Sequence, residues 1–86
     1  MTWRVNVRIL PRAGLLDPQG QAVEHALAAL RFPEARNVHV GRAIALEVAA
    51  PSAADAEAVV RRMCDKLLAN PVIEDYEIEV ESEGAA

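Results

Sequence analysis

The sequence predicts a ferredoxin-like α+β domain with the element order βαββαβ, in which a four-stranded antiparallel sheet carries two helices on one face. Two observations lead to this prediction. Segments near both ends and in the middle of the chain alternate apolar with polar residues, as half-buried strands do. Two other segments repeat apolar residues at the spacing of an amphipathic helix. At 86 residues, the chain has the length of a single domain, 1–86.

The first strand is expected at residues 3–9, where Trp3, Val5, Val7 and Ile9 alternate with polar side chains. A proline and a glycine follow it and favour a loop. The strand should therefore be half-buried and end before residue 14.

The first helix is expected to begin at Asp17-Pro18, because aspartate is a favoured N-cap and proline a favoured first helical residue. It should end before Pro33. Its core-facing stripe is formed by Val23, Ala26, Leu27 and Leu30.

A β-hairpin is expected next, with a β-branched strand at 37–40, a turn at Gly41-Arg42 and alternating apolar residues at 44–48. The second helix should begin at the capping pair Ser52 and Asp55.

The second helix is expected to end at Asn70, which tolerates a left-handed conformation, and Pro71 cannot continue it. Cys64 falls on its apolar stripe and should behave as a small buried hydrophobe.

The last strand is expected at 76–80, where Tyr76, Ile78 and Val80 alternate with glutamates. In this topology it lies antiparallel to the first strand, so Arg4 and Arg8 should face the glutamates at 77, 79 and 81. The face without helices would be polar, with small alanines at 43 and 45 that suit contact with another subunit.

The composition argues against several classes of protein. Nine basic and 13 acidic residues give a net charge of −4, and Trp3, Phe32 and Tyr76 are the aromatic residues, so we expect no nucleic-acid binding. No apolar run approaches the length of a membrane span, so we expect a cytoplasmic chain without a membrane partner. A chain this short buries a modest core, which favours self-association.

The residues offer little for catalysis. His25 and His39 have no nucleophile or carboxylate at a characteristic spacing, and together with Cys64 they do not form a metal-ligand pattern. Gly20 and Gly41 are isolated, so no phosphate-binding loop can be drawn. We therefore expect no catalytic, cofactor-binding or metal-binding residue in this chain.

Three segments carry a family resemblance: "LLDPQGQAVEHAL", "VHVGRAIALEV" and "CDKLLANPVIEDYEIEV". In this order and spacing, they closely resemble the PurS family, the small subunit of phosphoribosylformylglycinamidine (FGAM) synthase. The resemblance extends from Val5 to Val80 and implies a role in purine (IMP) biosynthesis. It also implies a homodimer or homotetramer.

What the resemblance implies is a non-catalytic subunit. The PurL synthetase uses ATP and Mg²⁺ to convert formylglycinamide ribonucleotide (FGAR) to FGAM, and the PurQ glutaminase releases ammonia from glutamine. The small subunit joins the two and supports ammonia transfer. ATP and Mg²⁺ therefore belong to the synthetase subunit of the complex.

Several residues match the family's motifs, and we expect them at an interface. These are Asp17, Gln19, Gly20, Gly41, Arg42, Asn70, Pro71, Glu74 and Asp75. Helix capping explains some of them, but a glycine in a first helical turn costs up to ~1 kcal/mol and suggests close approach of a backbone from the same chain or a neighbour. We therefore expect Gly20→Val to damage assembly more than folding.

Two segments depart from the family pattern. Arg42 stands where the family commonly has lysine, and "RFPE" at 31–34 stands where a glycine-phenylalanine pair often ends the first helix.

Two other functions remain open from the sequence. One is a ferredoxin-like ligand-binding regulatory domain, with an anion at the start of the first helix. The other is a small enzyme that uses His25 or His39.

Overall fold

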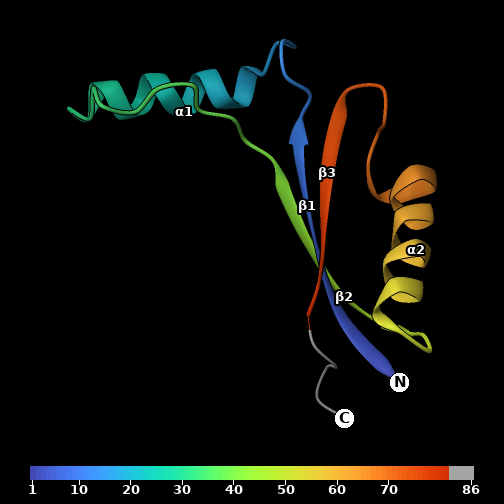
Figure 1. Ribbon diagram of the computed structural model, residues 1–86. Helices are drawn as coiled ribbons and strands as arrows, with labels where there is room; N and C mark the ends of the chain where they lie inside the picture. Colours follow the sequence, from blue (N-terminus) through green and yellow to red (C-terminus); the bar gives the residue numbers. More distant parts are fainter. Residues whose placement is uncertain (82–86) are drawn as a thin grey trace.

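The computed structural model describes residues 1–81. Within this range the chain forms strands, helices and one π-helical turn in the order shown in Figure 1. Their bounds are β1 Thr2–Pro11, α1 Pro18–Ala29, β2 Arg42–Ala49, α2 Ala53–Met63, the π-turn Cys64–Leu68 and β3 Glu74–Val80.

The strands of residues 1–81 form one antiparallel sheet with the order β2-β1-β3. The central strand β1 pairs with β2 on one side, where Val7 lies opposite Ile44, and with β3 on the other, where Val7 lies opposite Ile78. The predicted pairing of the first and last strands is confirmed. The predicted four-stranded sheet is wrong, because the described residues contribute three strands.

The missing strand is the one expected at residues 37–40. Asn37 has a left-handed backbone with φ 53°, which interrupts an extended chain. The N–H groups of Val38 and Val40 donate to the carboxylates of Glu24 and Asp17. Side chains of the preceding helix therefore occupy donors that a sheet would need, and β2 starts only at Arg42.

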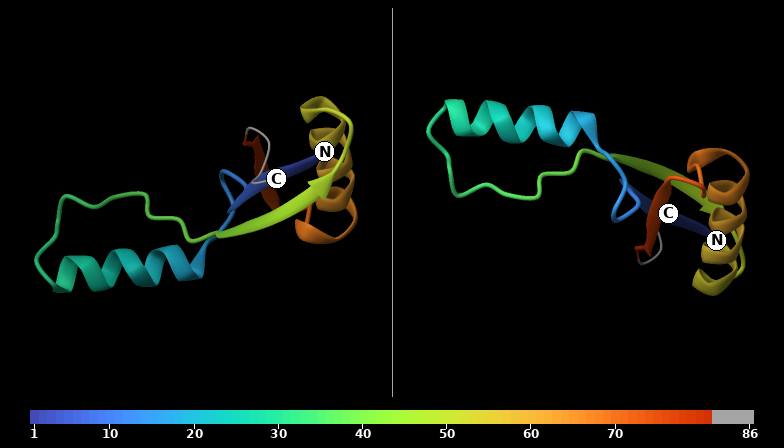
Figure 2. Two further views of the ribbon diagram at one scale, coloured as in Figure 1. Left: turned by 90° about the horizontal axis from the view of Figure 1, so that it is seen from below. Right: turned by 90° about the horizontal axis from the view of Figure 1, so that it is seen from above.

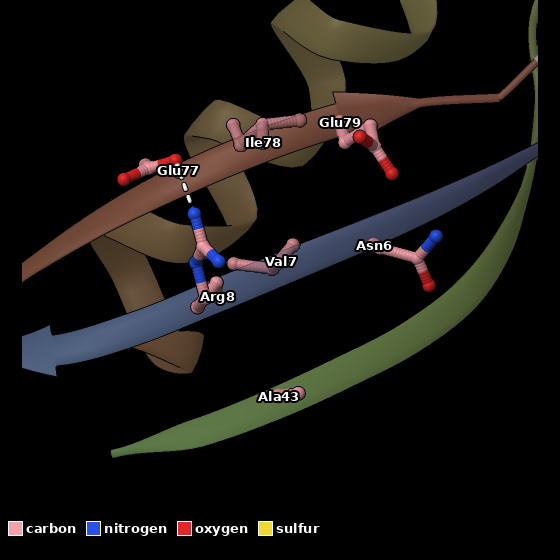
Figure 3. Close-up of a pocket in the computed structure, with 7 residues that line it drawn as sticks. All are labelled: Asn6, Val7, Arg8, Ala43, Glu77, Ile78 and Glu79. Carbon is pink, nitrogen blue, oxygen red and sulfur yellow. Dashed lines mark hydrogen bonds and ion pairs between the residues drawn. The ribbon is translucent and has the colours of Figure 1, made fainter. Parts of the chain in front are cut away.

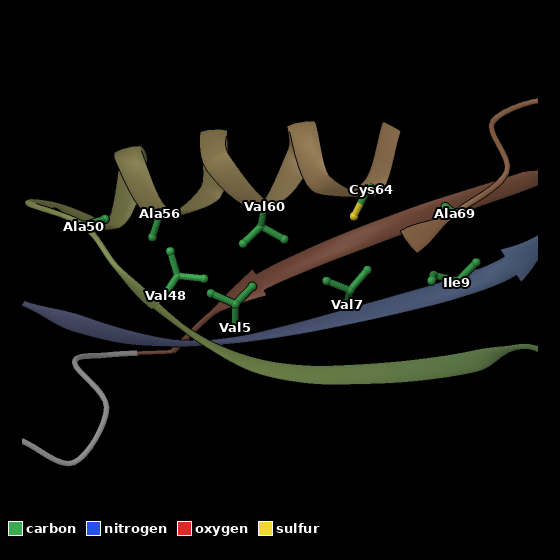
Figure 4. Packing of buried hydrophobic residues seen from close by; sticks show 9 residues of the cluster. All are labelled: Val5, Val7, Ile9, Val48, Ala50, Ala56, Val60, Cys64 and Ala69. Atoms are coloured by element: carbon green, nitrogen blue, oxygen red, sulfur yellow. The ribbon is translucent and has the colours of Figure 1, made fainter. Parts of the chain in front are cut away.

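The core lies between α2 and the sheet (Figure 4). Val5, Val7 and Ile9 point from β1 toward Val60 and Cys64, and all five are at most 1% exposed. Tyr76 and the other β3 residues of this face pack against the cluster while half-buried. The alternating apolar residues of β1 therefore pack against the apolar stripe of the second helix. The predicted burial of Cys64 is confirmed.

α1 does not lie on the sheet beside α2, so the prediction of two helices on one face is wrong. In Figures 1 and 2 α1 projects from one end of the sheet, and the chain returns alongside it before β2 begins. We call α1 with its returning segment, residues 18–41, the arm. Within α1, Gly20 is the one buried residue. The radius of gyration is 16.2 Å, whereas a compact chain of this length has about 12 Å.

The N-caps predicted from the sequence are confirmed at the start of both helices. Asp17 accepts a hydrogen bond from the Gly20 N–H at 3.0 Å, and Ser52 accepts one from the Asp55 N–H at 3.2 Å. The end of the second helix differs from expectation. Asn70 is not left-handed, and its side chain instead accepts from the Val72 N–H in a local turn.

The face of the sheet opposite α2 is polar, as expected (Figure 3). Arg8 forms a salt bridge with Glu77 at 2.8 Å, and the side-chain amide of Asn6 donates to Glu81. The Arg8 pair is exposed and adds little to stability. Across residues 1–81, no helix has both the length and the apolar character required to cross a membrane.

Candidate functional site: the loop end of the sheet

The predicted interface residues gather at one end of the sheet, although they come from three separate segments. Here β1 ends, α1 begins, and β2 and β3 start (Figure 1). We call this region the loop end. It contains the nine predicted residues Asp17, Gln19, Gly20, Gly41, Arg42, Asn70, Pro71, Glu74 and Asp75.

Asp17 joins the start of α1 to the segment before β2. One carboxylate oxygen accepts from the Gly20 N–H at 3.0 Å, and the other accepts from the Val40 N–H at 3.0 Å and lies 3.2 Å from His39 Nδ1. The two backbone hydrogen bonds lower the pKa of Asp17, partial burial opposes them, and His39 adds to the lowering. The charged Asp17 side chain therefore links the start of α1 to the segment before β2. Its own carboxylate occupies the helix start, where an anion would otherwise bind.

The two glycines of the loop end are required by contacts within the chain. A Cβ on Gly20 would lie 2.1 Å from the Val38 carbonyl oxygen, and one on Gly41 would lie 2.0 Å from the Ile9 carbonyl oxygen. The close approach inferred at Gly20 is thus made by the same chain. Gly20 is also buried, so Gly20→Val would force backbone segments apart and should damage folding as well as assembly.

The segment that follows the π-turn is held to the same region by charged side chains. Glu74 accepts from Arg42 at 2.7 Å and from the Asn70 N–H at 2.8 Å. Arg12 donates to the Pro71 carbonyl oxygen and lies 3.4 Å from Asp75. Asn70, Pro71, Glu74 and Asp75 therefore join the loop end through hydrogen bonds and ion pairs.

Two adjoining hollows lie on this surface. One of about 390 Å³ is lined by the predicted residues Asp17, Gln19 and Glu74 and by apolar side chains. The other, of about 500 Å³, extends over Gln19, Gly41, Arg42 and Glu74. Both are open to solvent, and they share Gln19, Glu74 and Val40, so they form one continuous hollowed surface at the loop end.

Sequence reasoning missed the apolar part of this surface. Leu16 is 73% exposed and Val72 is 75% exposed, while Leu15 and Ile73 are also exposed. Large exposed apolar side chains gathered at one place indicate a protein contact. The available signal was that "LL" and "VI" stand between the periodic segments, where no helix or strand would bury them.

The groups considered for catalysis are dispersed. His39 is bonded to Asp17, His25 lies on the exposed surface of α1, and Cys64 is in the core, where burial raises the pKa of its thiol. Among residues 1–81, no three His, Cys, Asp or Glu side chains are placed to hold a metal ion.

Fold and surface together define a small α+β domain whose loops present a firmly anchored, partly apolar face suited to contact with other proteins. Comparisons with known proteins identify the family. The family model for PurS, phosphoribosylformylglycinamidine (FGAM) synthase, matches residues 4–82. The chain belongs to the PurS family.

Several relatives support this assignment. The phosphoribosylformylglycinamidine synthase subunit PurS of Bacillus subtilis is 43% identical over 79 residues, which cover 92% of this chain and 93% of the relative. The crystal structure of Methanocaldococcus jannaschii PurS matches with a TM-score of 0.82 at 37% identity, over 92% and 95% of the two chains. A chain in the structure of PurLQS from Thermotoga maritima matches with a TM-score of 0.86 at 28% identity, over 94% and 99%.

Proposed function

We propose that this chain, as a PurS subunit of phosphoribosylformylglycinamidine synthase, joins the PurL synthetase to the PurQ glutaminase through its loop end. The complex converts FGAR to FGAM in purine biosynthesis and takes the nitrogen from glutamine. The chain provides a binding surface that positions the synthetase and the glutaminase relative to each other. It contributes no group that forms or breaks bonds, and it acts in the cytoplasm.

The observation that carries this proposal is the character of the loop end. Exposed leucine, valine and isoleucine side chains surround an anchored polar set at the point where the family's motifs meet. Such a combination of apolar contact area and fixed hydrogen-bonding groups is typical of recognition surfaces. The neighbour in the Thermotoga maritima PurLQS structure, which has the same fold, supports a place within a complex of this kind.

The proposal also assigns the cofactors. ATP and Mg²⁺ are used by the synthetase. The loop end would help to keep the ammonia path between glutaminase and synthetase closed to solvent, because ammonia that escapes is protonated and lost as a nucleophile. Its apolar residues suit this role, since they exclude water where two proteins meet.

A pair of matched variants tests the loop end. Leu16→Asp places a charge on the proposed contact surface, whereas Ala58→Asp places the same charge on an exposed position of α2. We expect Leu16→Asp to weaken binding to the two partner subunits at least tenfold, as measured by analytical ultracentrifugation of the mixture. Ala58→Asp should bind like the unmodified chain. Equal binding by all three proteins would refute the assignment of the contact to the loop end.

A further inference from the structure

We propose that the outer edge of β3 binds an extended segment of a catalytic subunit, in which apolar and basic side chains alternate. We call this edge, formed by the backbone of residues 74–80, the β3 edge. The inference rests on the proposed function and deepens it, because it adds a second contact to the loop end and names the chemistry of the segment that binds there.

The hydrogen-bond pattern of β3 leaves its outer backbone groups free to pair. At one end of the ladder with β1, the Glu81 N–H donates to the Arg4 carbonyl oxygen at 2.8 Å. At the other end, the Arg12 N–H donates to the Ile73 carbonyl oxygen at 2.8 Å. Bonded pairs alternate along an antiparallel ladder, so β3 directs the backbone groups of positions 75, 77 and 79 to β1. The N–H and C=O groups at 76, 78 and 80 therefore point outward.

Within residues 1–81, no further strand covers the β3 edge, because the sheet order is β2-β1-β3. α2 lies over the face of the sheet that carries the core (Figure 4). Proteins usually blunt an open edge with a bulge or a proline. β3 instead pairs with β1 in unbroken register from Glu74 to Val80 and contains no proline. The edge is therefore able to accept an extended segment by β-augmentation.

The charges beside the β3 edge are of one sign. Glu77 and Glu79 are exposed on the helix-free face (Figure 3), and Glu81 follows them on the same face. Glu77 pairs with Arg8 at 2.8 Å, whereas Glu79 and Glu81 form no ion pair among the described residues. Side chains of an added strand would lie about 4.5–5.5 Å from those opposite them. Basic side chains would therefore pair with these glutamates, and acidic ones would be repelled.

The other edge strand, β2, does not have this bias. Arg42 and Glu47 carry opposite charges there, and Ala43 and Ala45 occupy the positions between them on the helix-free face. A basic segment therefore gains more at the β3 edge than at β2.

The opposite side of the β3 edge is apolar. Ile78 and Val80 pack against the core while half-buried, on the face that α2 covers. Arg61 lies over the Tyr76 ring at 5.9 Å, and the Tyr76 hydroxyl donates to Asp65, so side chains of α2 already cover this part of the strand. Apolar side chains of an added strand would therefore extend the core beside Ile78 and Val80, opposite the face on which its basic side chains meet the glutamates.

A proline and an alanine at the same position test the backbone contact. Val80→Pro removes an outward N–H and leaves the donors to β1 in place, and proline is tolerated where an edge N–H faces solvent. Val80→Ala removes the same side-chain contacts and keeps the N–H. We expect Val80→Pro to bind the mixture of synthetase and glutaminase at least tenfold more weakly than Val80→Ala in analytical ultracentrifugation. Equal binding by two variants with the same circular dichroism would overturn the proposal.

A charge reversal tests the chemistry of the bound segment without altering the backbone. Glu79→Lys changes the charge beside the β3 edge, and Glu57→Lys makes the same change at an exposed position of α2. We expect Glu79→Lys to weaken binding at least fivefold relative to Glu57→Lys, and the difference should shrink at high salt. Equal binding by the two variants would refute a basic segment even if Val80→Pro failed to fold.

Two further outcomes separate this inference from the proposed function. If the unmodified chain binds both subunits and the variants at positions 79 and 80 bind as their controls do, the β3 edge is not a contact and the loop end remains one. If the unmodified chain does not bind, both proposals fail. Light scattering on the isolated proteins identifies a different occupant, because a smaller assembly for Val80→Pro than for Val80→Ala would place a second copy at the edge and overturn the proposal.

Discussion

Asp17 shows how one side chain serves both local folding and the shape of the candidate site. The sequence predicts its role as the N-cap of α1, and the Gly20 N–H bond confirms it. Its second oxygen binds Val40, which lies 23 residues away, and this contact could not be predicted because no periodicity or spacing encodes it. One carboxylate therefore fixes the direction of the helix and the path of the returning segment.

The charge of Asp17 predicts a pH dependence of stability. Hydrogen bonds from the Gly20 and Val40 backbones lower its pKa in the folded state below the ordinary value for an aspartate. A lowered folded pKa means that the unfolded chain takes up the proton first as pH falls. The stabilisation is therefore complete above about pH 5 and is lost as pH falls through the ordinary aspartate pKa toward the lowered one.

Thermal unfolding between pH 7 and pH 3 measures this contribution. We expect Asp17→Asn to have a lower Tm than the unmodified chain at pH 7 and a smaller loss of Tm on acidification, because asparagine carries no titratable charge. The control is Asp55→Asn, because the Asp55 carboxylate lies in the first turn of α2 and accepts a hydrogen bond from the Ser52 hydroxyl at 3.0 Å. If Tm fell in parallel with pH for Asp17→Asn and the unmodified chain, the ionised Asp17 carboxylate would not stabilise the fold.

At the scale of elements, the sequence predicts β1, β2, β3 and both helices, because their hydrophobic periodicity reflects real burial or an apolar surface. It fails at residues 37–40, where β-branched composition resembles a strand but Glu24 and Asp17 take the backbone donors. It also fails in placing α1, since periodicity reveals an apolar stripe and does not reveal which molecule covers it. The same limit applies to the loop end, whose motif residues come together only through tertiary contacts.

The junction between α1 and the segment before β2 predicts a strong effect of Gly20→Ala. A Cβ at this position would lie 2.1 Å from the Val38 carbonyl oxygen, which is backbone and cannot rotate away. We expect unfolding in urea to show a loss of about 1–3 kcal/mol, the usual range for overpacking, despite the better helix propensity of alanine. Gln19→Ala, at an exposed position in the same turn, should change stability by less than about 0.5 kcal/mol. An unchanged or raised stability of Gly20→Ala would show that the arm is not packed in this way.

At the scale of the whole molecule, an 86-residue chain divides its apolar surface among three places. One part forms the core beneath α2, another is exposed at the loop end, and the third lies along α1. A chain that covered all three would be more compact and would leave less apolar surface for contact with other proteins. This distribution suits a subunit whose function is to connect proteins, and it agrees with membership of the PurS family.

We propose that this chain connects the two catalytic subunits without contributing to the chemistry. The most direct test measures FGAM formation from FGAR and ATP by the synthetase and glutaminase, with and without this chain. Two nitrogen sources, glutamine and an ammonium salt, are compared. We predict that glutamine-dependent synthesis falls at least tenfold when the chain is omitted, while ammonium-dependent synthesis changes less than twofold. Glutamine-dependent synthesis that is equally fast without the chain would show that the chain does not connect the two subunits in this way.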